Sequence, residues 1–277
     1  MNSNLINTKL GIIEYSLIGK GIPIIFIHGG HSNCNETLCH KGFDLENFQL
    51  ITPSRPGYGR TPLAENKTPK QVADLILELL DYLSLENVII YGISAGGLTA
   101  IELASNYPDR VSKLILASAV SKKWLEKDGK TYKIAQKIFH PKIEEFIWRI
   151  VKFFSNIFPI LIGKYFYPQF SKNARHLLKK SDIEELVSSL QFYRSKMGFL
   201  NDIEQNIGSE SLMRIKCPTL IIHSENDNIV SIEHAKYSNR MIANSKLEVL
   251  HNEWGHIIWI GNDSKESIDK TLYFIEN

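Results

Sequence analysis

The chain has 277 residues, 43% hydrophobic and 22% charged, which is the composition of a globular protein with enough apolar material for a large core. Its formal net charge of +2 gives no reason to expect a nucleic-acid partner. Three cysteines are too few for a disulfide framework, and the N-terminus lacks a basic region followed by a long apolar run, so we expect a cytoplasmic protein without a secretory signal.

Seven short segments rich in Ile, Val and Leu are the predicted strands. They cover residues 12–18, 22–30, 48–54, 87–92, 113–120, 218–224 and 246–252. Several are apolar on consecutive residues, which is typical of strands buried on both faces of a parallel sheet. Between the third and fourth strands, apolar residues from Val72 to Leu83 recur at steps of three and four and predict a helix. At the start of this helix, the Thr68 side chain is predicted to cap the helix and Pro69 to begin its first turn. The Gln71 side chain is predicted to reach back to the capping residue.

The alternation of strands and helices predicts a doubly wound α/β fold that binds ligands at the carboxyl ends of its strands. Residues 121–212 differ from their flanks, because they hold 16 Lys and Arg against 10 Asp and Glu, and 15 of the 28 aromatic residues. The rest of the chain has 16 basic and 20 acidic residues. We therefore expect residues 1–120 and 213–277 to form one core, interrupted by an insert at residues 121–212.

The sequence Gly92-Ile93-Ser94-Ala95-Gly96 lies where a predicted strand ends and a helix begins. A serine on so tight a turn presents its oxygen above the edge of the sheet, and small neighbours let the backbone crowd around it. The same turn directs the N–H of Ala95 toward that oxygen, where it can stabilise negative charge. Small residues also occur at helix–sheet contacts for packing alone, but the strand–helix context favours Ser94 as a nucleophile.

A serine hydroxyl needs a base to take its proton and an acid to orient that base. His256, in "LHNEWGHII" after the last strand, is the predicted base, and Asp227, in "HSENDNIV" after the preceding strand, is the predicted acid. Each alone could be a surface histidine or a turn-forming aspartate. Both occur at the expected strand ends, in the chain order Ser94, Asp227, His256. Glu225 is the alternative acid.

A tetrahedral oxyanion needs two backbone N–H donors. Ala95 is predicted to supply one. The other should come from the glycines that end "IIFIHGG", and we assign Gly30, with Gly29 as the less favoured candidate. His28 in the same motif is predicted to be a structural hydrogen-bonding residue rather than a second base.

Six sequence segments occur in the same order as the motifs of a known protein family: "IIFIHGG", "SRPGYGRT", "VIIYGISAGG", "NYPDRVSKLIL", "HSENDNIV" and "WGH". With them, nearly the whole chain outside residues 121–212 resembles the α/β-hydrolase fold family, in its cap-bearing branch. The resemblance implies an eight-stranded, mostly parallel sheet with helices on both faces and a helical cap inserted after the sixth strand. It also assigns Ser94 as nucleophile, Asp227 as acid and His256 as base.

Three positions depart from the usual residues of this family: Ser54 replaces an Asp, His31 a Pro and His223 a Gly. The resemblance also narrows the chemistry. The family's haloalkane dehalogenases and epoxide hydrolases use an Asp nucleophile, so Ser94 argues against both. Its proline iminopeptidases carry Pro and Trp where this chain has His31 and Ala95. Hydrolysis of an ester, a thioester or a carbon–carbon bond by serine remains, with no cofactor required.

The insert is expected to determine the substrate. Residues 139–168 are dense in Phe, Ile, Tyr and Trp, but charges interrupt them, so we expect no stable membrane insertion. A cap of this composition can line an apolar pocket, although many of these residues must form the cap's own core. We predict substrate contacts from Gly29, His31, Trp124 and Trp148. The basic excess could recruit an acidic substrate or a membrane surface, or could be a solvated face.

A cluster of possible metal ligands, His28, His31, Cys34, Cys39 and His40, lies within 13 positions. Its spacing matches no closed zinc pattern, so we expect no metal.

The sequence as a whole predicts a serine hydrolase of the carboxylesterase type, acting on a small, largely apolar ester or related acyl compound as a monomer or homodimer. Two alternatives stay open: a carbon–carbon bond hydrolase of the same fold, and a ligand receptor or regulatory protein that retains the triad.

Overall fold

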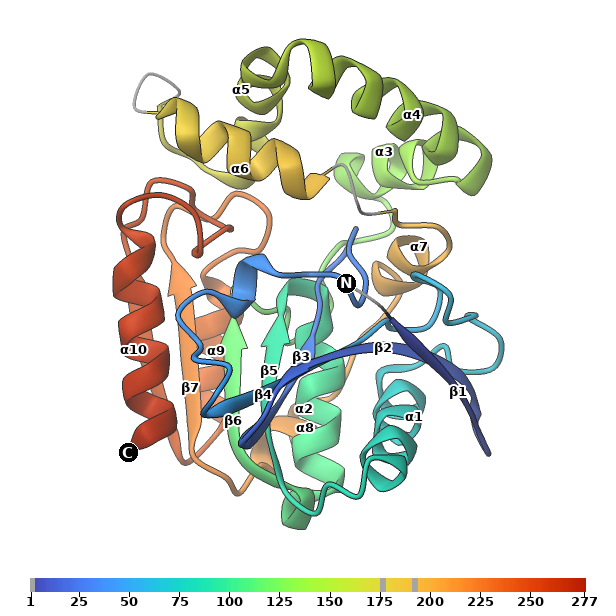
Figure 1. Ribbon diagram of the computed structural model, residues 1–277, viewed down its shortest axis with the longest axis vertical. Helices are drawn as coiled ribbons and strands as arrows, with labels where there is room; N and C mark the ends of the chain where they lie inside the picture. Colours follow the sequence, from blue (N-terminus) through green and yellow to red (C-terminus); the bar gives the residue numbers. More distant parts are fainter. Residues whose placement is uncertain (1–2, 175–177, 191–193) are drawn as a thin grey trace.

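The computed structural model describes residues 3–174, 178–190 and 194–277. Within these residues an eight-stranded sheet has the strand order β1-β2-β4-β3-β5-β6-β7-β8 (Figure 1). The strands are β1 (Asn4–Thr8), β2 (Gly11–Gly19), β3 (Ile22–Ile27), β4 (Phe48–Pro53), β5 (Val88–Ile93), β6 (Val111–Ala117), β7 (Thr219–Ser224) and β8 (Ser245–Leu250). β1 and β2 pair antiparallel, as do β2 and β4, whereas the strands from β4 to β8 run parallel. The predicted mostly parallel eight-stranded sheet is therefore confirmed.

Ten α-helices are assigned within the described residues. They are α1 (Pro69–Tyr82), α2 (Gly97–Asn106), α3 (Lys130–Ile138), α4 (Pro141–Ile157), α5 (Pro159–Phe170), α6 (Lys180–Leu190), α7 (Gly198–Asp202), α8 (Ser209–Met213), α9 (Glu233–Met241) and α10 (Ser264–Glu276). The predicted start of α1 is confirmed, because the Thr68 side chain accepts a hydrogen bond from the Gln71 N–H and the Gln71 side chain accepts one from Thr68.

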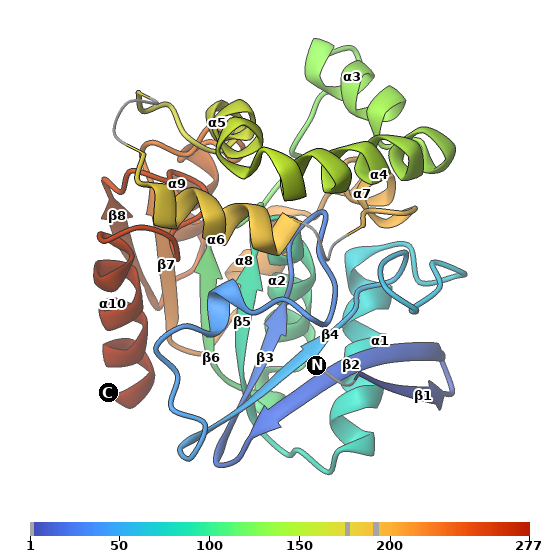
Figure 2. The same cartoon turned by 45° about the horizontal axis from the view of Figure 1, so that its top comes forward.

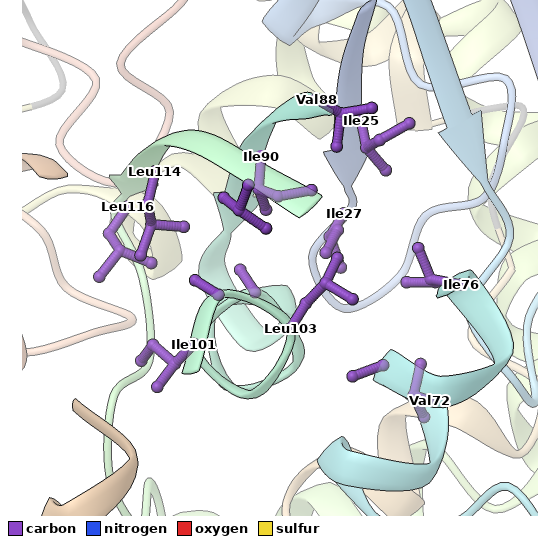
Figure 3. Close-up of a cluster of buried hydrophobic side chains, with 14 of the residues drawn as sticks. Ile25, Ile27, Val72, Ile76, Val88, Ile90, Ile101, Leu103, Leu114 and Leu116 are labelled. Carbon is purple, nitrogen blue, oxygen red and sulfur yellow. The ribbon is translucent and has the colours of Figure 1, made fainter. Parts of the chain in front are cut away.

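Two hydrophobic clusters cover the two faces of the sheet, because side chains alternate along each strand. Ile25 and Ile27 of β3 belong to the cluster that includes α1, α2, α8 and α9, whereas Ile24 and Phe26 belong to the cluster that includes α10. Figure 3 shows part of the first cluster, with side chains of α1 and α2 against those of the central strands. Both faces are therefore buried, as the apolar strand sequences predict.

β1 was not among the predicted strands. Its sequence, NLINT, is short and mostly polar, and Leu5 is exposed. β1 lies at the edge of the sheet and pairs only with β2 among the described strands. An edge strand that buries few side chains leaves little hydrophobic pattern in the sequence.

Four helices, α3 to α6, lie over the carboxyl ends of the parallel strands (Figures 1 and 2). We call them the cap helices. The final part of the predicted insert lies in the core instead: Leu212 is buried in the same cluster as α2, and Ser211 Oγ donates to Glu102 Oε1 at 2.6 Å. We therefore propose that the cap ends before α8, a few residues earlier than the boundary at residue 212.

Candidate active site

Ser94 lies at the junction of β5 and α2, on a turn with a backbone φ of +49°. This left-handed conformation is strained for a residue other than glycine. Its small neighbours are required by space. A Cβ added to Gly96 would lie 2.2 Å from the carbonyl oxygen of Ile27, and one added to Gly92 would lie 2.5 Å from the Cβ of Ala100. The predicted steric reason for the small residues is thus confirmed.

Three side chains from distant parts of the chain form one line of hydrogen bonds. The Nδ1–H of His256 donates to Asp227 Oδ2 at 2.7 Å, and His256 Nε2 lies 3.1 Å from Ser94 Oγ. In this tautomer Nε2 accepts the hydroxyl proton of Ser94. Asp227 follows β7, His256 follows β8, and all three side chains are buried. The sheet topology therefore brings together the acid, base and nucleophile that the sequence predicts.

The carboxylate of Asp227 accepts hydrogen bonds from both backbone and side-chain groups. Its Oδ1 accepts hydrogen bonds from the backbone N–H groups of Ile229 at 2.7 Å and Val230 at 2.9 Å. Burial alone would raise the pKa of Asp227, but the charge of His256 and hydrogen bonds from His223 and His256 outweigh it and hold that pKa well below its usual value. Asp227 is consequently an anion at neutral pH and can orient the imidazole.

His223 occupies the position where the resembling family usually has glycine. Its Nε2 lies 2.9 Å from the carbonyl oxygen of Val230 and 3.2 Å from Asp227 Oδ2. In place of the glycine, this chain therefore has a buried imidazole N–H donor next to Asp227. The alternative acid, Glu225, lies elsewhere, because its carboxylate accepts from His251 Nδ1 at 2.6 Å on the surface.

The loop after β3 passes directly beside Ser94. A Cβ added to Gly29 would lie 2.9 Å from the Cβ and 3.5 Å from the Oγ of Ser94. A Cβ added to Gly30 would meet the ring of Phe199 at 2.7 Å. The two glycines therefore fill a narrow gap between Ser94 and a side chain of α7. Ala95, the other predicted oxyanion donor, follows Ser94 at the start of the helical segment.

A buried arginine, Arg55, fixes this loop. Its guanidinium donates to the carbonyl oxygens of His28 at 2.7 Å and Gly29 at 3.0 Å. It also donates to both carboxylate oxygens of Asp202 in α7, at 2.6 and 2.7 Å, and the hydroxyl of Tyr58 donates to the same carboxylate at 2.5 Å. Burial lowers the pKa of Arg55, but the charge of Asp202 more than offsets this and raises it.

Sequence reasoning missed the role of Arg55 and Asp202, although "SRPGYGRT" was singled out as a motif. The same network includes His28, whose Nε2 accepts from the Arg55 N–H at 3.0 Å and whose Nδ1–H donates to the carbonyl of Gly29 at 2.7 Å. Both ring nitrogens are thus bonded to backbone groups, in agreement with the structural role predicted for His28.

Aromatic side chains of the cap gather above the same loop. His31 packs against Trp148 of α4 with the rings tilted and their centroids 4.0 Å apart, and Phe139 packs on Phe199 with a centroid distance of 4.2 Å. Trp124 contacts Phe199 at 5.8 Å. The structure thus brings Gly29, His31 and Trp148 near one another and joins Trp124 to them through residues that sequence reasoning did not select. The density of aromatic residues in the insert was the available signal for Phe139 and Phe199.

His31 is a neutral ring within this cluster. Burial, with a smaller contribution from the charge of Arg194, lowers the pKa of His31 to about 3. Its Nδ1 lies 2.7 Å from Ser195 Oγ. Among the residues that the structure describes, no group of three or more His, Cys, Asp or Glu side chains could hold a metal ion.

Comparisons with known proteins agree with this architecture. Residues 22–146 match the family model of the alpha/beta hydrolase fold. The chain is 39% identical over 273 residues to the uncharacterized hydrolase YcgS of Bacillus subtilis, with 96% of both chains covered. Among solved structures it resembles an alpha/beta hydrolase fold protein from Nakamurella multipartita (TM-score 0.83, 23% identity, 99% of this chain and 98% of that one covered). It also resembles the esterase EaEST from Exiguobacterium antarcticum (TM-score 0.74, 24% identity, both chains fully covered). The chain therefore belongs to the alpha/beta hydrolase fold family and is a hydrolase.

Proposed function

We propose that this hydrolase cleaves small, largely apolar esters or related acyl compounds, with Ser94 as the nucleophile. The observation that supports the proposal most strongly is the continuous line of hydrogen bonds from Asp227 through His256 to Ser94. A buried serine held in strained backbone beside an oriented imidazole has no evident structural purpose. The arrangement fits nucleophilic catalysis.

The proposed reaction begins when His256 Nε2 takes the proton of Ser94 Oγ as the oxygen attacks the substrate carbonyl. The N–H groups of Ala95 and Gly30 stabilise the oxyanion that forms. His256 then returns the proton to the departing alcohol, which leaves the acyl group on Ser94. A water molecule, deprotonated by the same imidazole, releases the acid and restores the serine. Every proton in this sequence is exchanged at one ring nitrogen.

The cap supports an apolar acyl or alcohol group as the recognised part of the substrate. Trp148, His31, Phe139 and Phe199 form an aromatic cluster beside Gly30, and His31 is neutral within it. Such a surface favours apolar groups over charged ones, because a charge buried there would lack a partner. We propose that these residues, with Trp124, select the substrate.

Turnover of p-nitrophenyl acetate and butyrate tests the proposal. The wild type should hydrolyse both continuously, whereas Ser94→Ala should lose at least about a thousandfold in kcat/KM, because the nucleophile is removed. Ser188→Ala, which removes an exposed hydroxyl on α6, is the matched control and should retain full activity. Acylation of Ser94 without release of the acid would contradict hydrolytic turnover and favour the receptor alternative.

A substrate panel then separates the remaining chemistries. Esters, thioesters and vinylogous diketones should be compared at equal concentration with the purified protein. We expect the highest kcat/KM for esters with short apolar acyl groups. Preferential cleavage of the diketones would show that the carbon–carbon bond alternative is the right one.

A further inference from the structure

The outer surface of the cap exposes an unusual number of large apolar side chains. On α4 these are Ile143, Phe146, Ile150, Phe153 and Ile157, with exposed fractions between 41% and 63%. Phe158, between α4 and α5, is 51% exposed, and Leu161 and Tyr165 on α5 are 67% and 69% exposed. We call these side chains the cap surface. Contiguous exposed apolar groups of this extent mark interaction sites on globular proteins.

The helix α4 presents its apolar stripe to solvent rather than to the protein. Ile143, Phe146, Ile150, Phe153 and Ile157 recur at steps of three and four, so they share one face of the helix. In an ordinary surface helix such a stripe is the buried face. Here the opposite side contains the buried residues, among them Glu144 and Ser155.

An ion pair between the buried Glu144 and the half-buried Arg194 supports this orientation of α4. Glu144 is 1% exposed, and its carboxylate accepts hydrogen bonds from Arg194 at 2.6 and 2.9 Å and from the backbone N–H of Ser195 at 3.0 Å. Rotating the apolar stripe inward would expose the Glu144 carboxylate and separate it from the Arg194 guanidinium. The rotation would also give up the hydrogen bonds that the Glu144 carboxylate accepts from Arg194 and from the Ser195 N–H. The outward direction of the stripe is therefore built into the packing of the cap.

The charges beside the cap surface have one predominant sign. Lys142, Arg149 and Lys152 on α4 and Lys164 on α5 are all exposed. Of the acidic residues on these two helices, Glu144 is paired inside the cap, and the exposed Glu145 pairs with Arg149 at 3.4 Å, so the three lysines supply the positive excess. An apolar stripe bordered by cations is the pattern of helices that lie in the plane of an anionic lipid interface.

We propose that the cap surface docks on an anionic membrane, with α4 and α5 lying along the lipid interface. Among the residues that the structure describes, none of the helices has the length and hydropathy of a membrane span. Figures 1 and 2 show α4 and α5 at the outer end of the molecule, where a flat surface can reach them. A second copy of the chain fits less well, because two such faces would bring like charges together.

Vesicle flotation tests the proposal without reference to catalysis. The wild type should float with vesicles of phosphatidylglycerol and phosphatidylcholine, and much less with phosphatidylcholine alone. Lys142→Gln combined with Lys152→Gln should weaken binding roughly tenfold or more, since each cation near an anionic surface contributes to it. Phe146→Ser combined with Phe153→Ser should weaken it similarly. Raising the salt from about 0.1 to about 0.5 M should reduce the binding of the wild type.

Matched controls place equivalent changes away from the cap. Tyr82→Ser and Tyr273→Ser remove apolar side chains that are 62% and 66% exposed on α1 and α10, and both should bind as the wild type does. Ser94→Ala should also bind normally, so failure of the proposed hydrolysis and failure of the docking are separate results. Equal binding to both vesicle types, or no binding, would overturn the proposal. So would a lipid-free dimer in sedimentation equilibrium that the two phenylalanine changes dissociate.

Discussion

At the scale of single residues, Asp227 is distinguished by how many donors its carboxylate receives. Two backbone N–H groups, His256 and the nearby His223 all face it. In an asparagine at this position, the amide oxygen would keep the two backbone donors and the amide nitrogen would face His256 and donate to Nδ1. The imidazole would then carry its proton on Nε2 and could not accept the proton of Ser94.

Asp227→Asn should accordingly reduce kcat for ester hydrolysis by about four orders of magnitude with little change in secondary structure, as in serine hydrolases with the same triad logic. The measurement is steady-state hydrolysis of p-nitrophenyl butyrate together with far-ultraviolet circular dichroism. Glu225→Gln is the control, because that carboxylate pairs with His251 on the surface. Near-normal rates for the Asp227 variant, or a large loss for the Glu225 variant, would show that another carboxylate orients His256.

The residues around Ser94 could be predicted from the sequence because their constraint is local. A serine between Gly92 and Gly96 at a strand–helix junction already specifies the crowded turn, and the clash distances follow from it. The contact of His31 with Trp148 could not be predicted in the same way. It joins positions more than a hundred residues apart through the packing of the cap, for which the sequence contains no spacing rule.

At the scale of secondary structure elements, the ion pair of Arg55 and Asp202 connects three segments. Arg55 follows β4, Asp202 ends α7, and the same guanidinium holds the two carbonyl groups of the loop after β3. Sequence reasoning predicted the motif around Arg55 but not this partner, because 147 residues separate the two. The loop that borders Ser94 therefore depends on a residue of the insert.

Asp202→Asn should destabilise the protein by about 3–5 kcal/mol, because it leaves the charge of Arg55 buried without its counter-ion. Urea unfolding at neutral pH measures this change. Tyr58→Phe, which removes only the hydroxyl donor to the same carboxylate, should cost roughly 1–3 kcal/mol. Equal and small effects for both variants would mean that water replaces the lost partner and that the pair contributes little.

The sequence predicted which strands are present better than it predicted where segments begin and end. The seven predicted strands all correspond to strands, whereas β1 was missed, and we propose that the insert ends before α8 rather than at residue 212. The charge and aromatic counts that marked the insert are averages over many residues. Such averages cannot place a boundary to within a few positions, whereas the burial of Leu212 in the core cluster supports the earlier end that we propose.

At the scale of the whole molecule, several histidines are held in the neutral form by the fold. Burial lowers the pKa of His31 to about 3, of His40 to about 4 and of His234 to about 4. In the unfolded chain each would titrate near 6.5. Between about pH 4 and 6.5 the unfolded state therefore binds more protons than the native state, and stability decreases as the pH falls through this range.

The free energy of unfolding should thus decline as the pH is lowered from about 6.5 to about 4, by up to about 1.4 kcal/mol per pH unit for each such histidine. Urea titrations at a series of pH values measure the slope. His40→Gln should reduce the slope by the contribution of one proton, whatever its effect on the stability itself. The depressed pKa of Asp227 adds a loss of the same sign only at still lower pH. A flat profile across this range would refute the linkage.

The contacts of α7 with Tyr58 and Arg55 also restrict where substrate can enter and where product can leave. Gly198 packs so closely on Tyr58 that an added Cβ would lie 2.1 Å from its ring, and Asp202 is bound to Arg55 four residues later. The helix α7 is thus held tightly against the residues that follow β4. We therefore expect the side of the site formed by α7 to keep its position during turnover, so that substrate entry and product release depend on the cap helices α3 to α6 rather than on the residues beside Ser94.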